Sequence, residues 1–116
     1  MKREECIFIK DILEQIMLIQ RFTKNVPKEM FERDLNLRDA TIRRLEIIGE
    51  AVKNISKETK HKYPKIKWKN VSGTRDILIH AYFGVDMDLI WKAVKVDIPI
   101  LKKQMQKILK DLNQQV

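Results

Sequence analysis

The stretch that decides the fold is LRDATIRRLEIIGEAVKNI, residues 37–55. Mostly apolar residues recur in it at regular intervals. These positions follow one another in steps of three and four residues, which is the spacing of one face of an α-helix. They are Leu37, Thr41, Leu45, Ile48, Val52 and Ile55. We therefore expect a long helix whose seam packs against other helices in a bundle.

Similar patterns lie on both sides of this stretch. Residues 4–22 carry a broad apolar face and predict an N-terminal helix that is buried on more than one side. Pro27 suits the first turn of a second helix. Ser56 suits the cap of a short helix, which must end near Pro64 because the residue before a proline avoids the α region.

The C-terminal part predicts a basic loop and two further helices. The loop is expected at 65–70, and the segment 72–74, Ser-Gly-Thr, offers a capping start for a helix that ends at the glycine break of 83–85. Asp86 or Asp88 can cap the last helix. Its apolar pattern runs from 90 to 112 and contains Pro99, which we expect to kink it or open it locally.

Composition supports a single helical domain over residues 1–116. Hydrophobic residues make up 44% of the chain, and only three glycines and three prolines are present, too few for a sheet protein with frequent turns. We expect an all-α fold, an antiparallel up-and-down bundle of four principal helices plus a short extra helix. No apolar run approaches the length of a membrane span, and the acidic start does not resemble a secretion signal, so we expect a cytoplasmic protein.

The charge balance points to a partner. The chain carries 24 Lys and Arg against 16 Asp and Glu, a formal net charge of +8. A basic surface attracts RNA or DNA through the release of counterions. It equally suits an acidic protein partner, or only the solubility of a lysine-rich surface.

Four residues with useful chemistry lie together in TRDILIHAYF, residues 74–83: Arg75, Asp76, His80 and Tyr82. They can bind a phosphate, accept a hydrogen bond, transfer a proton and act as a nucleophile. The alternative is structural, with Arg75 and Asp76 as a charge pair at a helix end and the other two at the core edge. On a straight helix His80 is rotated by about 140° from Arg75, so a distorted helix or a second subunit would be needed to bring them together.

The remaining candidates for chemistry are weaker. His61 lies in a basic stretch and reads as a surface residue. Glu46 and Glu50 are four residues apart, but no histidine joins them at metal-ligand spacing, so we expect them to pair with Arg43, Lys53 or Asn54 or to support a cleft. The single cysteine, Cys6, can form no internal disulfide. We expect neither a metal site nor a bound cofactor.

The order Arg75-x4-His80-x-Tyr82 resembles the R-x4-H-x-Y signature of the HepT-like ribonucleases, members of the HEPN superfamily. The resemblance extends over nearly the whole chain. It includes the segment 45–51 (LEIIGEA), Tyr63-Pro64 followed by Trp68, and the stretches 82–86 (YFGVD) and 90–91 (IW). Asp76 stands where many members carry Asn.

This resemblance implies a HEPN bundle and a metal-independent endoribonuclease toxin of a type VII toxin–antitoxin system. It implies a homodimer whose cleft holds both signatures. It also implies a minimal nucleotidyltransferase antitoxin (MntA-like), which blocks the tyrosine that matches Tyr82 by transferring AMP to it from ATP.

The residues fit RNA cleavage by chemistry that can be argued separately. The 2′-hydroxyl of RNA becomes an internal nucleophile when a base such as His80 removes its proton. Arg75 would hold the phosphate, and Asp76 would orient Arg75 or the histidine. Lys65, Lys67 and Lys69 could follow the RNA backbone while Trp68 stacks on a base, unless Trp68 only anchors its loop to the core. The rival hypothesis is a non-catalytic helical partner of a nucleotidyltransferase, or a subunit that binds its substrate.

Overall fold

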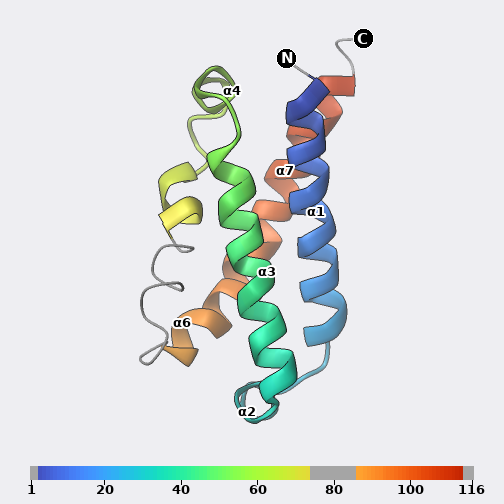
Figure 1. The fold of residues 1–116 in the computed structure, drawn as a ribbon, viewed down its shortest axis with the longest axis vertical. Helices are drawn as coiled ribbons and strands as arrows, with labels where there is room; N and C mark the ends of the chain where they lie inside the picture. Colours follow the sequence, from blue (N-terminus) through green and yellow to red (C-terminus); the bar gives the residue numbers. More distant parts are fainter. Residues whose placement is uncertain (1–2, 74–85, 114–116) are drawn as a thin grey trace.

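The computed structural model describes residues 3–73 and 86–113, and every regular element in these two ranges is helical (Figure 1). The long elements are α1 (Arg3–Thr23), α3 (Leu35–Lys53) and a continuous C-terminal unit formed by α6 (Met87–Lys92), η1 (Ala93–Asp97) and α7 (Ile98–Asn113). The short ones are α2 (Lys28–Arg33) and α4 (Lys57–Lys62). The all-α prediction is confirmed.

The long helices form an antiparallel bundle. In Figure 1, α1 runs in the opposite direction to α3 and α7, and it packs against both. The described chain therefore starts and finishes at the same end of the bundle. The predicted helix that carries the signature falls on residues 74–85, outside the described residues.

The core lies along the seam that the spacing predicts. In α3, Thr41, Leu45, Ile48 and Val52 are buried, and Ile55 continues the line beyond the helix. They meet two rows of buried apolar side chains, one on α1 (Ile9, Ile12, Ile16, Ile19) and one on the C-terminal unit (Ile98, Leu101, Met105, Ile108, Leu112). No helix within 3–73 or 86–113 is long and apolar enough to cross a membrane.

Polar side chains fix the ends of several helices. Ser56 accepts a hydrogen bond from the Thr59 amide at 3.1 Å and caps α4, and Asp86 caps α6 by accepting from the Asp88 amide at 2.9 Å. Both caps were predicted. Pro27 precedes α2 as its cap residue instead of lying in its first turn.

A break at Asp34 was not predicted. Asp34 has extended backbone angles and separates α2 from α3. Its carboxylate accepts a hydrogen bond from the Leu37 amide at 3.1 Å, so it caps the long helix in the usual manner of an aspartate.

The prediction of a loop over 65–70 was wrong in its second half, because residues 68–73 are helical. Ser72 therefore lies inside a helix and does not start one, and its hydroxyl donates to the Lys69 carbonyl at 3.3 Å. The physical reason is the indole of Trp68, which is only 8% exposed and fixes the chain at this point.

Pro99 opens the last helix as predicted, and the opening takes the form of a π-helix. The amide of Ile98 donates to the carbonyl of Ala93, five residues earlier instead of four. Pro99 has no amide hydrogen and cannot supply the next α-helical bond. The wider turn of η1 ends at Asp97, two residues before the proline, and so lies next to the missing bond.

Candidate nucleic-acid interface

The predicted catalytic residues and the predicted modification site lie outside the described residues. Arg75, Asp76, His80 and Tyr82 all fall within 74–85. The described part of the site is the chain that leads into the signature, together with the helices against which this chain packs.

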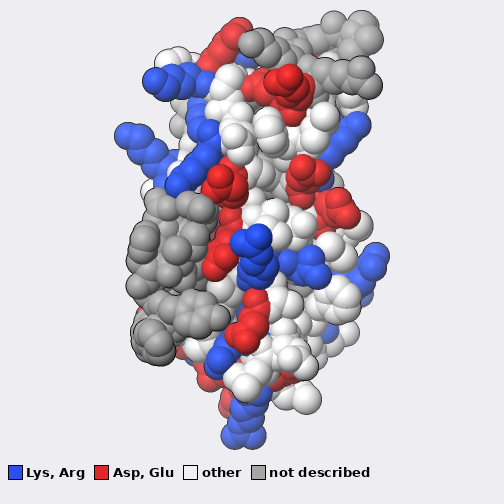
Figure 2. Space-filling model, in the orientation of Figure 1, with Lys and Arg blue, Asp and Glu red and all other residues white. Residues whose placement is uncertain are grey.

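This leading segment, residues 57–69, is strongly basic. It contains six lysines and one glutamate, together with His61. Figure 2 shows basic side chains gathered over α4 and the chain that follows it, while acidic and basic side chains alternate over α1 and α3. A local excess of positive charge attracts a phosphate backbone.

The second half of the basic segment alternates between buried and exposed side chains. Ile66 and Trp68 are buried, whereas Lys65, Lys67 and Lys69 are exposed. The Trp68 indole donates from Nε1 to the Tyr63 carbonyl at 3.1 Å. These contacts favour an anchoring role for Trp68, one of the two roles that the sequence left open, and they present the three lysines to solvent.

Tyr63 ties the same segment to the C-terminal helix. Its hydroxyl donates to the Asp111 carboxylate on α7 at 2.6 Å. Burial, and then the neighbouring Asp111 carboxylate, raise the pKa of Tyr63 to about 12. The phenol is therefore neutral at physiological pH and serves as a hydrogen-bond donor.

Glu5, which the sequence analysis did not single out, holds the start of α4. Its Oε1 accepts from the Ser56 amide and its Oε2 from the Thr59 hydroxyl, both at 2.7 Å. Burial raises the pKa of this carboxyl, but the hydrogen bonds from Ser56 and Thr59 outweigh burial, and the pKa lies below 4.5. One sequence signal was available, because Glu5 is in helical phase with Ile9, Ile12 and Ile16 on the buried face.

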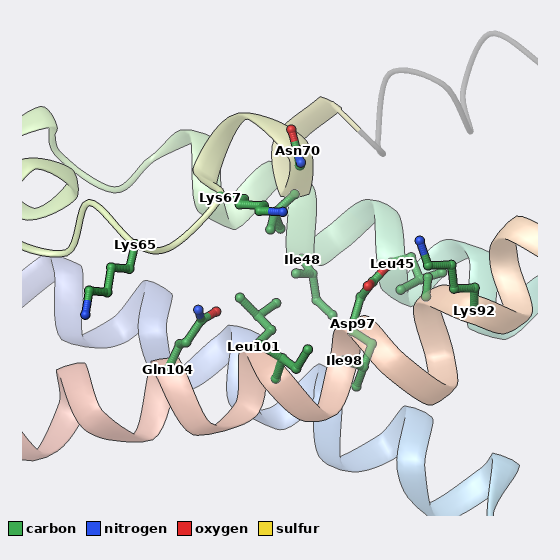
Figure 3. A pocket seen from close by; sticks show the side chains of 13 residues that line it. Leu45, Ile48, Lys65, Lys67, Asn70, Lys92, Asp97, Ile98, Leu101 and Gln104 are labelled. Carbon is green, nitrogen blue, oxygen red and sulfur yellow. The ribbon is translucent and has the colours of Figure 1, made fainter.

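A pocket of about 450 Å³ lies beside the basic segment (Figure 3). Its walls come from α3, from the segment 65–71 and from the C-terminal unit. Apolar side chains from α3 and α7 line its interior, among them Leu45, Ile48, Ile98 and Leu101. Polar side chains surround them: Lys65, Lys67, Asn70, Lys92, Asp97 and Gln104. Sequence reasoning missed this pocket because no single motif contains it.

The remaining candidate residues for chemistry are exposed or take part in local contacts within the fold. His61 is exposed on α4. Glu46 pairs with Arg43 at 3.2 Å, one of the predicted partners, and the side-chain Nδ2 of Asn54 donates to the backbone carbonyl of Glu50. Among the residues that the structure describes, no three histidine, cysteine, aspartate or glutamate side chains are grouped so that they could hold a metal ion.

Comparison with known proteins gives a family match over most of the chain. Residues 12–108 match the model of the family described as "Ribonuclease HepT-like". This range includes the basic segment, the pocket and residues 74–85.

Curated relatives agree with this match. The chain is 48% identical over 110 residues to the probable ribonuclease HepT of Thermococcus cleftensis, covering 95% of this chain and 100% of that protein. It is 47% identical over 111 residues to a protein of Methanocaldococcus jannaschii named "Putative RNase", covering 96% of this chain and 92% of the relative.

A second protein of Methanocaldococcus jannaschii is longer. It carries the name "Gamma-glutamylcyclotransferase and putative RNase", and it is 47% identical over 113 residues. The match covers 97% of this chain but 51% of that relative, so this chain spans about half of its length. No solved structure matches the chain.

Proposed function

Because this chain belongs to the HepT-like ribonuclease family, we propose that it is the RNA-cleaving toxin of a type VII toxin–antitoxin pair. In this proposal it acts as a homodimer, cleaves RNA without a metal ion, and is neutralised by AMP attached to Tyr82. The observation that carries the proposal is the family match over residues 12–108, a range that includes Arg75, His80 and Tyr82. The basic segment that leads into these residues supports it.

The proposed reaction uses the 2′-hydroxyl of the substrate. His80 removes the proton, and the 2′-oxygen attacks the neighbouring phosphorus while the bond from phosphorus to the 5′-oxygen breaks. The departing oxygen takes a proton from solvent, to which His80 then releases the proton that it removed. The products end in a 2′,3′-cyclic phosphate and a 5′-hydroxyl, so no water is consumed in this step.

The charged neighbours stabilise the transition state. The Arg75 guanidinium forms paired hydrogen bonds to the phosphate, whose equatorial oxygens gain charge during the attack. Asp76 orients Arg75 or the histidine. The exposed lysines at 65, 67 and 69 attract the RNA backbone to this end of the chain.

The proposed control blocks the same site. A minimal nucleotidyltransferase transfers AMP from ATP to the Tyr82 oxygen, with release of pyrophosphate and loss of the phenolic proton. The tethered AMP adds negative charge and offers Arg75 a phosphate in place of the substrate. Because the group is covalently attached, its effective concentration reaches the mM range and RNA competes poorly.

An RNA with a single 2′-deoxy position tests the proposed reaction. The purified protein is incubated with an oligonucleotide that is cleaved at one bond, and with the same oligonucleotide carrying deoxyribose on the 5′ side of that bond. We expect cleavage and a cyclic phosphate terminus with the first, and an intact second oligonucleotide. Cleavage of the deoxy substrate at the same bond would refute internal attack by the 2′-oxygen.

A further inference from the structure

The pocket between α3, the segment 65–71 and the C-terminal unit has the features of a nucleotide-binding subsite. We infer that it holds one unpaired nucleotide of the RNA substrate, with the base against the apolar interior and the flanking phosphates at the lysines. This inference rests on the proposed function, since it assumes that RNA is the substrate.

The interior suits the face of a base. Leu45, Ile48, Ile98 and Leu101 are all buried, and they line a space of about 450 Å³. Pockets for small organic molecules have volumes of about 300–1,000 Å³ and mostly apolar walls. Burial of a base against such apolar walls removes its faces from water, which contributes binding free energy for every base.

The rim suits the charged and polar parts of a nucleotide. Figure 3 places Lys65 at one end of the pocket and Lys92 at the other, with Lys67 between them. All three are exposed, and among the described residues that line the pocket Asp97 is the acidic one. Positive charge therefore prevails at the mouth, as binding of two successive phosphates requires.

Asp97 and Gln104 add the ability to distinguish bases. A carboxylate accepts hydrogen bonds, so it favours a base with an exocyclic amino group, as in the contact of acidic side chains with cytosine. Uracil offers no amino group. We therefore expect oligo(C) and oligo(A) to bind more tightly than oligo(U).

The position along the chain connects the pocket with the cleavage site. Val71 lines the pocket and Arg75 follows four residues later, so their Cα atoms are at most about 14 Å apart even in an extended chain. One RNA strand can thus occupy both. A base can enter the pocket only when it is unpaired, which excludes double-stranded RNA.

The experiment measures binding without cleavage. All proteins carry His80→Ala, and fluorescence anisotropy follows the binding of short labelled oligo(C), oligo(A), oligo(U) and an RNA duplex. Gln104→Trp fills the pocket with an indole. Gln106→Trp is the matched control, because it makes the same change on an exposed position of the same helix, about 200° around the axis.

We expect Gln104→Trp to weaken oligo(C) binding about tenfold, the loss of one base contact, and Gln106→Trp to leave it unchanged. We also expect the duplex to bind more weakly than the single strands. Equal binding by the two tryptophan variants, or a duplex that binds as tightly as oligo(C), would overturn the inference. So would free AMP or CMP competing as strongly per molecule as the oligonucleotides, since the pocket would then belong to a free nucleotide.

A charge variant decides the question if Gln104→Trp does not fold. Lys92→Gln removes a rim lysine that lies outside the basic segment, and Lys24→Gln removes an exposed lysine just after α1. We expect only Lys92→Gln to reduce the salt dependence of binding, by about 0.7 in slope for the lost phosphate contact. Equal slopes in the two variants would contradict the inference.

Cleavage assays on the same tryptophan variants with His80 intact separate this inference from the proposed function. If the protein with all native residues does not cleave RNA, the proposed function fails, whereas the binding comparison still decides what the pocket holds. If both variants cleave and bind as the native protein does, only the inference fails.

Discussion

At the scale of single residues, Glu5 shows how one buried charge joins distant parts of the chain. It is 6% exposed, and it accepts hydrogen bonds from Ser56 and Thr59, about fifty residues away in sequence. These bonds place α4 against the start of α1. These hydrogen bonds therefore hold the start of the basic segment in place.

Replacement of Glu5 should destabilise the protein. Glu5→Ala leaves the Ser56 amide and the Thr59 hydroxyl without their acceptor, and we expect the free energy of unfolding in urea to fall by about 2–3 kcal/mol. Glu4→Ala, at an exposed position beside it, should change it by less than about 0.5 kcal/mol. Equal effects of the two changes would show that the buried carboxylate contributes nothing.

The same carboxyl gives stability a dependence on pH. Folding lowers its pKa below 4.5, so its contribution is fully present above pH 4.5 and is lost as the pH falls through the lower folded value. We expect the difference in stability between the native protein and Glu5→Gln to shrink as the pH falls below 4.5. A difference that stays constant down to pH 2 would contradict this.

Tyr82 is the residue at which we expect control, and Tyr63 is its matched control, since the chain has two tyrosines. In cells that also make the proposed minimal nucleotidyltransferase antitoxin, mass spectrometry should find AMP on the native protein and on Tyr63→Phe. Tyr82→Phe should carry no AMP and should stop growth, because it escapes inhibition. Detection of AMP on the Tyr82→Phe protein would show that another residue is the site of modification.

At the scale of elements, the sequence predicts the helices well where a single local signal determines the backbone conformation. The seam over 37–55, the caps at Ser56 and Asp86 and the opening before Pro99 all follow from local chemistry. The break at Asp34 and the helix over 68–73 were missed, because an aspartate suits many positions and Trp68 acts through burial against distant residues. The pocket was missed for the same reason, since its walls come from three separate segments.

The π-helix gives an element-scale prediction. Pro99→Ala restores an amide donor where a helical proline costs about 3 kcal/mol relative to alanine. We expect the melting temperature to rise as η1 tightens toward α-helical bonding. Because Lys92, Ala93 and Asp97 line the pocket, binding of oligo(C) should weaken at the same time. A lower melting temperature would show that the packing of the bundle, and not the proline, sets the π-helix.

At the scale of the whole molecule, the proposed active site belongs to a dimer. A straight helix separates Arg75 and His80 by about 140° around its axis. A two-fold axis would bring the same patch of two subunits together and so complete the site. Sequence supplied the residues of this site, but it contains no information on how two copies meet.

Mixing two inactive variants tests the shared site. Arg75→Ala and His80→Ala are each expected to be inactive alone. If the site takes Arg75 from one subunit and His80 from the other, one of the two clefts in a mixed dimer has both residues, and activity should return to at most about a quarter of the native value. Mixtures that stay inactive although mass spectrometry detects mixed dimers would contradict a site shared in this way.

Cleavage of RNA in EDTA by the native protein, His80→Ala and His61→Ala is the most direct test of the central claim. The two variants remove the two histidines of the chain one at a time, and His61 lies exposed on α4. We expect the native protein and His61→Ala to cleave equally, and His80→Ala to lose at least about 10²-fold in rate while keeping the native circular dichroism spectrum. Full activity of His80→Ala, or no cleavage by the native protein until a metal is added, would contradict the account.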